Sequence, residues 1–297
     1  MSRRYREHSY YEASARERLL GLLDPGSFNE FLGPRARMTS PHLAQLDVPS
    51  AFDDGVIVGE GTLDAKPVLA AAQEGAFIGG SVGEVHGAKI VGLLERAVAK
   101  RPAGVLMLLE SGGVRLHEAN AGLIAISEII RAVLAARASG TPVIGLIGGA
   151  NGCFGGMGIV ARCCDRIIVS EEGRLALSGP EVIETVKGVE EFDSRDRALV
   201  WRTTGGKHRF LLGEADALVA DSLPAFRQAA LAALDQPRCF TLEEIEAQHA
   251  QLVRRCERYG QCDDAIDIWR EQGITEPERL PLLEAEDFLR KADRRRM

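Results

Sequence analysis

Residues 148–180, GGANGCFGGMGIVARCCDRIIVSEEGRLALSGP, place a glycine pair between a buried strand and an apolar helix. The preceding run, TPVIGLI at 141–147, is short, apolar and bounded by proline and glycine, which predicts a fully buried strand. Gly155 and Gly156 then begin a helix that runs to about Cys164. The first N–H groups of a helix are unpaired and partly positive, so glycines there let an anionic oxygen approach. The alternative is that the pair only permits a tight turn or close packing.

A second glycine pair follows a second apolar run. Residues 103–110, AGVLMLLE, predict another buried parallel strand, which leads into SGGVRLHEAN at 111–120 and an apolar helix over 121–138. Two strand ends, each followed by glycine amides and a helix, suit a site that directs two donors at one oxygen. We therefore expect an oxyanion hole with one amide from Gly112 or Gly113 and one from Gly155 or Gly156.

Several motifs resemble a known family. ESGGVRLHEAN at 110–120 and SVGEVHGAKIVGLLERA at 81–97 resemble the carboxyltransferase family, which includes the beta subunits of acyl-CoA carboxylases. ANGCFGGMGIVARCCDRII is similar to the signature of the wider crotonase superfamily, and the motifs together cover roughly residues 55–235. Within the family, a single domain of this length with GGANGCFGGMG and SGPEVIE most resembles the beta subunits of biotin-independent malonate decarboxylases.

The resemblance implies an α/β fold, the ClpP/crotonase-like spiral of ββα units with a C-terminal helical extension. We expect an N-terminal helix and loop extension over 1–50, a crotonase-like carboxyltransferase domain over 51–238 and the helical extension over 239–297. The alternation of strands and helices itself predicts a parallel sheet with right-handed crossovers. The pattern also indicates a helix over 14–23 and a hairpin over 55–73.

The resemblance also implies a function. It predicts decarboxylation of a malonyl thioester, carried on an acyl-carrier protein, to the acetyl thioester and carbon dioxide through an enolate. No cofactor is expected to bind directly, because the acyl group arrives on the phosphopantetheine-type arm of the carrier. The family's site lies between two crotonase-type domains, so the expected partners are a homologous gamma subunit, the acyl-carrier protein subunit and an alpha acyl transferase subunit. The alternatives are a biotin-linked carboxyltransferase subunit, a crotonase-type acyl-CoA hydratase or hydrolase, and a non-catalytic scaffold.

Side chains near the second glycine pair complete this expectation. Related hydratases carry a glutamate three residues after the glycine that corresponds to Gly156, whereas this chain has Ile159, which disfavours hydration. Glu181 is the rough counterpart of the second hydratase glutamate; it either protonates the enolate or is a helix-start carboxylate. Phe154, Met157 and Ile159 are candidates to line an apolar pocket around the departing carboxylate.

Cationic side chains are candidates to meet the substrate's anionic groups. Arg115 lies two residues from Gly113, where a planar guanidinium could bind a carboxylate in a bidentate manner, and Ser111 is placed beside the same substrate. Further candidates, each of which could equally be a surface charge or a packed histidine, are Lys89, His86, His117 and the cluster 207–209.

Composition excludes other classes. A net charge of −7 argues against a nucleic-acid-binding surface, and no run of 18 apolar residues predicts a membrane span. The charged N-terminal start lacks an apolar signal region, so we expect a cytoplasmic protein. The six cysteines form no CxxC pair and have no histidine at zinc spacing, which predicts no metal. Cys153 is either a small packed side chain or a thiolate near a helix start.

Overall fold

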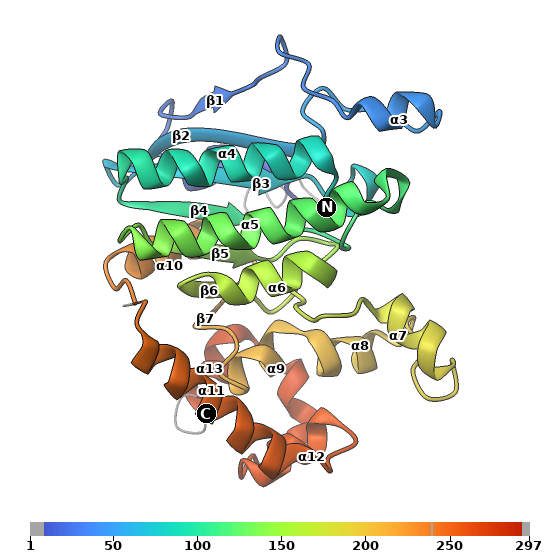
Figure 1. Ribbon diagram of the computed structural model, residues 1–297. Coiled ribbons are helices and arrows are strands. Elements are labelled where there is room, and N and C mark those ends of the chain that lie inside the picture. The colour runs from blue at the N-terminus through green and yellow to red at the C-terminus, as the bar shows by residue number, and fades with distance from the viewer. Residues whose placement is uncertain (1–8, 239, 293–297) are drawn as a thin grey trace.

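A seven-stranded sheet forms the centre of the protein in a computed structural model that describes residues 9–238 and 240–292. The strands lie side by side in chain order (Figure 1). They are β1 (Asn29–Phe31), β2 (Val56–Leu63), β3 (Lys66–Gln73), β4 (Gly104–Leu108), β5 (Val143–Ile147), β6 (Arg166–Ser170) and β7 (Ala217–Val219). The pairs β1/β2 and β2/β3 are antiparallel, and the strands from β3 to β7 are parallel.

The predicted hairpin is present as β2 and β3. Leu63 pairs with Lys66, and the two residues between them, Asp64 and Ala65, have φ values of 52° and 60°. A two-residue turn with both φ values positive matches the right-handed twist of the strands that it joins. The hairpin therefore leads the chain into the parallel part of the sheet through β3.

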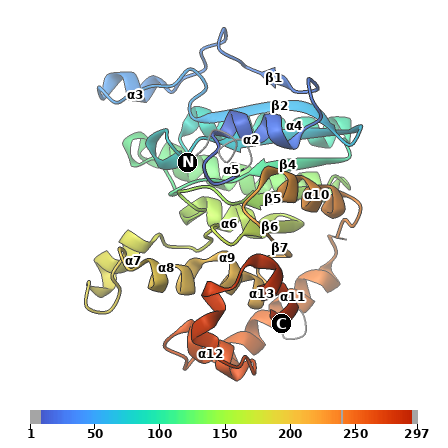
Figure 2. The ribbon, with the colours of Figure 1, turned by 180° about the vertical axis from the view of Figure 1, so that it is seen from behind.

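Helices cover both faces of the sheet (Figures 1 and 2). One face carries α4 (Glu84–Lys100), α5 (Asn120–Ala138) and α6 (Gly155–Cys163), which connect successive parallel strands. The other face carries α2 (Ala15–Leu22) and α10 (Leu223–Leu234). Since right-handed crossovers between strands in sequential order place their helices on one face, α4, α5 and α6 form one layer.

The central strands of the sheet are buried on both faces. In β4, Val105 and Met107 belong to the core that includes α4, α5 and α6, while Leu106 and Leu108 belong to the core that includes α2 and α10. Successive side chains of a strand point to opposite faces, so a strand covered on both sides is apolar at every position. This explains why the central strands read as continuous apolar runs.

The remaining elements lie beyond the β6 and β7 end of the sheet or at its margins. They are α3 (Pro41–Gln45), α7 (Pro180–Lys187), α8 (Arg197–Thr204), α9 (Gly206–Leu211), α11 (Leu242–Tyr259), α12 (Ala265–Glu271) and α13 (Ala285–Ala292), with short 3-10 helices at Ile78–Gly80, Leu116–Glu118 and Pro277–Leu282. Trp269 and Phe288 join the same core as the α4 to α6 layer, and the Phe288 ring meets Phe210 edge to face at 6.1 Å. The C-terminal helices are thus packed onto the sheet domain. The domain boundaries stay a prediction.

No helix within the described ranges combines the length and apolar character needed to cross a membrane.

Candidate active site

Two glycine-containing segments lie side by side at the carboxyl ends of β4 and β5. The first glycine loop follows β4 and contains Gly112 and Gly113, and the second follows β5 and leads to Gly155 and Gly156. Ser111 and Cys153 form a parallel bridge between them. The Ser111 N–H donates to the Gly152 carbonyl at 2.8 Å, and the Phe154 N–H donates to the Ser111 carbonyl at 2.8 Å. Neighbouring parallel strands end at the same edge of the sheet, so this pairing brings together two segments about forty residues apart in the chain.

The closest approach is between Gly113 and Gly155. A Cβ on Gly155 would lie 2.9 Å from the Gly113 Cα, a distance that side chains do not adopt. Both residues also have positive φ, 131° at Gly113 and 59° at Gly155, which other residues adopt only with strain. Glycine at these two positions therefore lets the two backbones touch.

The hydrogen bonds of the glycine amides discriminate among the predicted donors. The Gly112 N–H donates to the Gly79 carbonyl at 2.8 Å, and the Gly155 N–H donates to the Leu177 carbonyl at 2.9 Å. The prediction that these two amides could serve as donors is therefore wrong for this arrangement, because each is already paired. The Gly113 N–H donates to Ser111 Oγ at 3.2 Å.

Gly156 keeps a free amide. It occupies the second position of α6, where an α-helix has no internal acceptor, and its N–H has no partner among residues 9–238 and 240–292. Of the four predicted glycines, Gly156 is the one that fits the predicted donor.

Sequence reasoning missed a second free amide at Val114. The flanking groups are paired, since the Val82 N–H donates to the Gly113 carbonyl and the Arg115 N–H donates to the Val82 carbonyl, both at 2.9 Å. The Val114 N–H itself has no acceptor within the described part of the chain. A search for glycines overlooks it, because an amide donor needs no particular side chain. Only the register of the Val82 and Val114 bridge reveals it.

Arg115 is not placed to bind a substrate carboxylate. Its side chain is fully buried, and Nη1 pairs with Asp54 at 3.0 Å and with Glu118 at 2.7 Å. Nη2 donates to the Asp54 and Ser81 carbonyls. The substrate-binding prediction for Arg115 is therefore corrected: both Nη atoms of its buried guanidinium are already bonded to the segments around the first glycine loop.

The predicted apolar pocket does not form from its three candidates. Met157 is fully buried in the core between the sheet and its helices, Phe154 is 3% exposed, and Ile159 is 45% exposed on the surface of α6. Successive helix positions point in different directions, so Met157 packs inward while Ile159 points outward. The Arg174 guanidinium instead lies over the Phe154 ring, with its Cζ atom 5.6 Å from the ring centre. Ser111 is buried, with its hydroxyl group bonded within its own loop.

Glu181 is exposed at the start of α7. It follows Pro180 in the first turn of α7, four residues after the Leu177 carbonyl that accepts from Gly155. A Cβ built on Gly179 would lie 3.7 Å from the Glu181 carboxylate, so the side chain folds back over the helix start. This position suits a carboxylate that stabilises a helix N-terminus.

The other predicted cations are mostly structural. Lys89 is buried and donates to the carbonyls of Asp53, at 2.7 Å, and Val56. Burial lowers the pKa of His86 to about 3, with the charge of Arg115 adding to the effect. His86 is thus a neutral packed histidine, and the prediction that it or Lys89 meets substrate is not supported by this arrangement. His117 is exposed beside the first loop.

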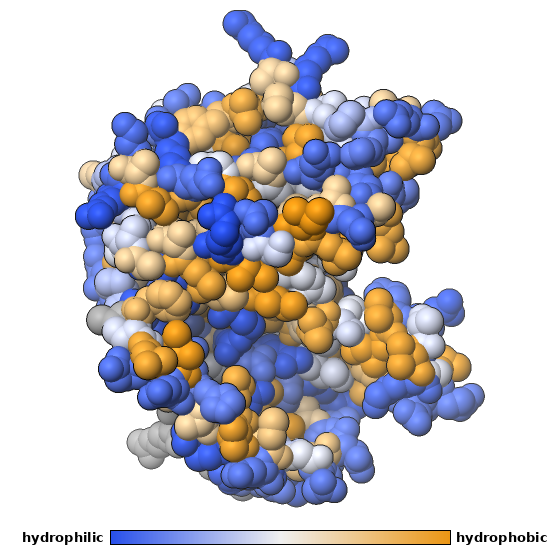
Figure 3. Space-filling model, in the orientation of Figure 1, coloured by the Kyte–Doolittle hydropathy of each residue, from blue (hydrophilic) through white to orange (hydrophobic). Residues whose placement is uncertain are grey.

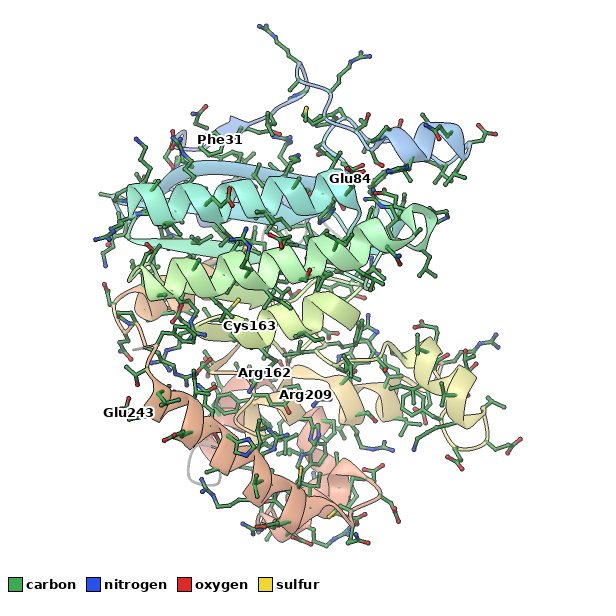
Figure 4. The ribbon with its side chains drawn as sticks, viewed as in Figure 1. Phe31, Glu84, Arg162, Cys163, Arg209 and Glu243 are labelled. Carbon is green, nitrogen blue, oxygen red and sulfur yellow. The ribbon has the colours of Figure 1, made fainter. Side chains whose placement is uncertain are left out.

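The cluster 207–209 is also engaged in structure. Lys207 pairs with Glu171 at 3.1 Å and donates to two carbonyls of the C-terminal segment. Arg209 pairs with Glu214 at 2.9 Å, and Figure 4 shows it between α6 and the C-terminal helices. Burial lowers the pKa of His208 to about 3. These side chains join the sheet domain to its C-terminal helices.

Cys153 is fully buried, and burial raises the pKa of its thiol above the usual range, which fits the packed reading. No group of three or more His, Cys, Asp or Glu side chains that could hold a metal ion occurs in the described residues. The absence of a structural metal stays a prediction.

Exposed apolar side chains occur on the segments that follow the glycine loops in the chain. Figure 3 shows apolar surface on the projecting arm that carries α7 and on the facing part of the sheet domain. On the arm, Val182 and Val186 are 55% and 80% exposed. The whole set, here called the apolar rim, is Leu116, Leu123, Ile124, Ile159, Leu177, Val182, Val186 and Val189. Large exposed apolar patches mark sites of protein association.

Comparison with known proteins identifies relatives along the whole chain. Residues 6–219 match the carboxyl transferase domain family. The chain is 43% identical to the malonyl-S-ACP:biotin-protein carboxyltransferase of Malonomonas rubra, covering 97% of this chain and 96% of that protein. It is 33% identical to the methylmalonyl-CoA carboxyltransferase 12S subunit of Propionibacterium freudenreichii over 74% of this chain, and spans 42% of that protein.

Solved structures agree with these sequence matches. A chain in the crystal structure of a Pseudomonas malonate decarboxylase hetero-tetramer in complex with malonate has a TM-score of 0.80 and 44% identity, covering 88% of this chain and 96% of that one. A chain of the Pseudomonas malonate decarboxylase hetero-dimer has a TM-score of 0.66 and 40% identity, covering 84% of this chain and all of that one.

Proposed function

Because the chain belongs to the carboxyl transferase family, we propose that it removes the carboxylate of a malonyl thioester as one subunit of a multi-subunit enzyme. The predicted family and the crotonase-like α/β fold are confirmed by the comparisons. The names of two relatives support malonyl chemistry, since one acts on a malonyl-carrier thioester and another is a malonate decarboxylase.

The observation that carries the proposal is the pair of free amides at Val114 and Gly156. Val114 follows Gly113, and Gly156 follows Gly155. Because the backbones of these two glycines touch, both free N–H groups lie next to the same contact. Two unpaired donors from neighbouring loops suit a single thioester oxygen. We assign Val114 and Gly156 as the donors of the oxyanion hole.

The reaction follows from stabilising that oxygen. As the bond between the α carbon and the carboxylate breaks, its electron pair stays on the α carbon and spreads onto the thioester oxygen as an enolate. Carbon dioxide leaves, and the α carbon then takes up a proton to give the acetyl thioester. One oxyanion donor contributes about 2.7 to 4 kcal/mol of barrier lowering, so two amides would accelerate the step by on the order of 10⁴ to 10⁶.

The fate of the carboxyl group separates two readings that share this enolate. In one, it is released as carbon dioxide, as the name malonate decarboxylase implies for a structural relative. In the other, it passes to a biotin protein, as the name of the Malonomonas protein states for that relative. The two relatives match over the same share of their own length, 96%, so similarity alone does not separate the readings. We propose release as carbon dioxide, which the labelling experiment below distinguishes from transfer to biotin.

The apolar rim supports a partner chain. Its eight exposed side chains lie on the segments that follow the loops with the free amides, so we propose that a protein covering the rim would also exclude water from the site. Relatives of similar fold occur in a hetero-dimer and a hetero-tetramer. We propose a homologous gamma subunit on the rim, an acyl-carrier protein whose phosphopantetheine-type arm presents the substrate, and an alpha acyl transferase subunit that loads the carrier.

The test uses the chain purified with its partner subunits and malonyl thioester labelled at the free carboxylate. We expect label in carbon dioxide and acetyl thioester as the product. Label on an added biotin protein would establish the carboxyltransferase reading, and recovery of the label as free malonate, formed by thioester hydrolysis, would overturn the proposal. Parallel assays with malonyl-CoA and malonyl-carrier protein determine which thioester is used, and the chain alone should be poorly active.

A further inference from the structure

A buried carboxylate, that of Glu110, links the two glycine loops that carry the free amides. Glu110 directly precedes Ser111 and is 4% exposed. One of its oxygens accepts the Asn151 N–H at 3.0 Å, and the other pairs with Arg18, which is 2% exposed. Glu110 belongs to the first loop, Asn151 to the second and Arg18 to α2, so three separate segments meet at one carboxylate.

The surroundings of this carboxylate are shaped to hold it. A Cβ on Gly149 would lie 2.3 Å from the carboxyl carbon of Glu110, and a Cβ on Gly75 would lie 2.4 Å from its Oε1. Asn151 Nδ2 also donates to the Gly75 carbonyl at 2.6 Å. Backbone thus encloses the carboxylate on two sides, which leaves it little freedom to move.

Arg18 is held as firmly as its partner. Its Nε donates to the Tyr10 carbonyl at 2.8 Å, and its guanidinium lies over the Tyr10 ring, 4.8 Å from the ring centre. Tyr10 in turn stacks on Phe226 of α10 at 3.9 Å. The N-terminal helix is therefore connected to the glycine loops through a buried, packed ion pair.

We propose that Glu110 is a positioning residue that keeps the loop of Gly156 in register with the loop of Val114, and that Arg18 holds Glu110 in place. The inference rests on the proposed oxyanion hole. The bond from Asn151 to Glu110 is a second connection between the loops, beside the bridge of Ser111 with Cys153. The bridge joins the loops by two backbone hydrogen bonds centred on Ser111, and the Glu110 carboxylate adds a bond at a different point, which further restrains the relative tilt of the loops.

The variants separate positioning from stability. Removing one charge leaves its partner buried and unpaired, which unfolds many proteins, so the informative variants remove both. Arg18→Met with Glu110→Met deletes the pair and the acceptor of the Asn151 N–H. Arg18→Met with Glu110→Gln deletes the charges but keeps an acceptor oxygen.

A matched control exists at the opposite edge of the sheet. Arg137 and Asp165 form another buried ion pair at 2.9 Å, and Asp165 also accepts a backbone N–H, that of Val143, at 2.7 Å. Arg137→Met with Asp165→Leu removes a pair and a backbone acceptor at the start of β5, whereas the glycine loops follow the strand ends.

The assay is decarboxylation by the assembled complex at a temperature where circular dichroism shows every variant folded. A displacement of about 1 Å can reduce a rate by about 10²-fold. We expect that loss in kcat for the double Met variant, with KM changed less than about threefold, and at least partial recovery with Glu110→Gln. The control pair should stay within about threefold of the parent. Equal kcat values for the double Met variant and the control would overturn the inference.

Amide hydrogen exchange gives a readout independent of activity. In the double Met variant, peptides covering 148–158 should exchange faster by about tenfold or more, because the loop opens more often, while the control leaves them unchanged. Unchanged exchange there would also overturn the inference. If the parent complex fails to decarboxylate malonyl thioesters, the proposed function fails, and the exchange comparison still decides whether Glu110 positions the loops.

Discussion

Gly155 and Gly113 touch backbone to backbone, with a Cβ on Gly155 only 2.9 Å from the Gly113 Cα. The residue after each one, Gly156 and Val114, carries an N–H without an acceptor among the described residues. The contact explains why glycine is needed at 113 and 155, while the proposed donors are their neighbours. The glycines therefore act by letting the loops approach, and the chemistry is assigned to the amides that follow.

Removing the Gly156 N–H tests one arm of the oxyanion hole. A side chain at 156 would meet Ile126 of α5 at 2.7 Å, so Gly156→Pro is made together with Ile126→Ala, and Ile126→Ala alone is the control. Proline lacks an N–H but is compatible with the first turn of a helix. We expect kcat to fall by about 10² to 10³ relative to the control, with thioester binding reduced far less. A folded double variant within fivefold of the control would exclude this donor.

Val114→Pro tests the second arm. The Val114 N–H makes no hydrogen bond to the described residues, so proline removes the proposed donor without breaking a structural bond. We expect a loss in kcat of about 10² to 10³, whereas Val114→Ala, which keeps the N–H, should stay close to the parent. Steady-state kinetics of the complex, with circular dichroism of both variants, provide the check. Equal activity of the two variants would exclude the Val114 N–H as a donor.

Glu181→Gln tests the proton donor. The carboxylate is exposed in the first turn of α7, where stabilising the helix start suffices to explain it. We therefore expect turnover of the complex to fall by less than about threefold. General acid catalysis contributes about 10² to 10⁴, so a loss of that size would show instead that Glu181 protonates the enolate once a partner covers it.

The apolar rim predicts a specific assembly defect. Val182 and Val186, one helical turn apart on α7, are both exposed, so Val182→Asp with Val186→Asp should leave the isolated chain folded. Burying two carboxylates in an interface is unfavourable, and we expect association with the gamma subunit to weaken by at least about tenfold. Leu20→Asp, at a residue of α2 that is 57% exposed, is the control. Sedimentation or calorimetry measures the affinity, and an undiminished affinity would place the partner elsewhere.

Buried histidines predict acid sensitivity. Burial lowers the pKa of His208 to about 3. Below about pH 6.5 the unfolded chain binds a proton on this imidazole while the folded chain does not, so stability falls as the pH decreases from 6.5 towards 3. At pH 5 this residue should cost about 2 kcal/mol relative to pH 7. Urea unfolding at both pH values should show a smaller difference in the free energy of unfolding for His208→Phe than for the parent, and an equal difference for the two proteins would contradict the prediction.

Much of the fold follows from local sequence patterns. β5 covers residues 143–147 of the apolar run at 141–147, and the helices predicted over 121–138 and 155–164 occur within a residue or so of those bounds. Burial on both faces makes such strands continuously apolar, and turn residues mark their ends, so these signals are readable without knowing the partner strands. The approach of the two glycine loops was also predictable, because parallel strands end at one edge.

The choice of donors and the roles of the charged residues depended on the tertiary structure. Whether an amide is free depends on which carbonyl lies opposite, and Gly79 and Leu177, the partners of Gly112 and Gly155, are more than twenty residues away along the chain. Arg115 is adjacent to the site in sequence, yet Asp54, sixty-one residues earlier, occupies its guanidinium. The sequence alone determined the strands, the helices and the two loops, since these depend on near neighbours. Hydrogen-bond pairing and burial are properties of distant segments brought together, so only the folded structure could decide which groups remain free to react.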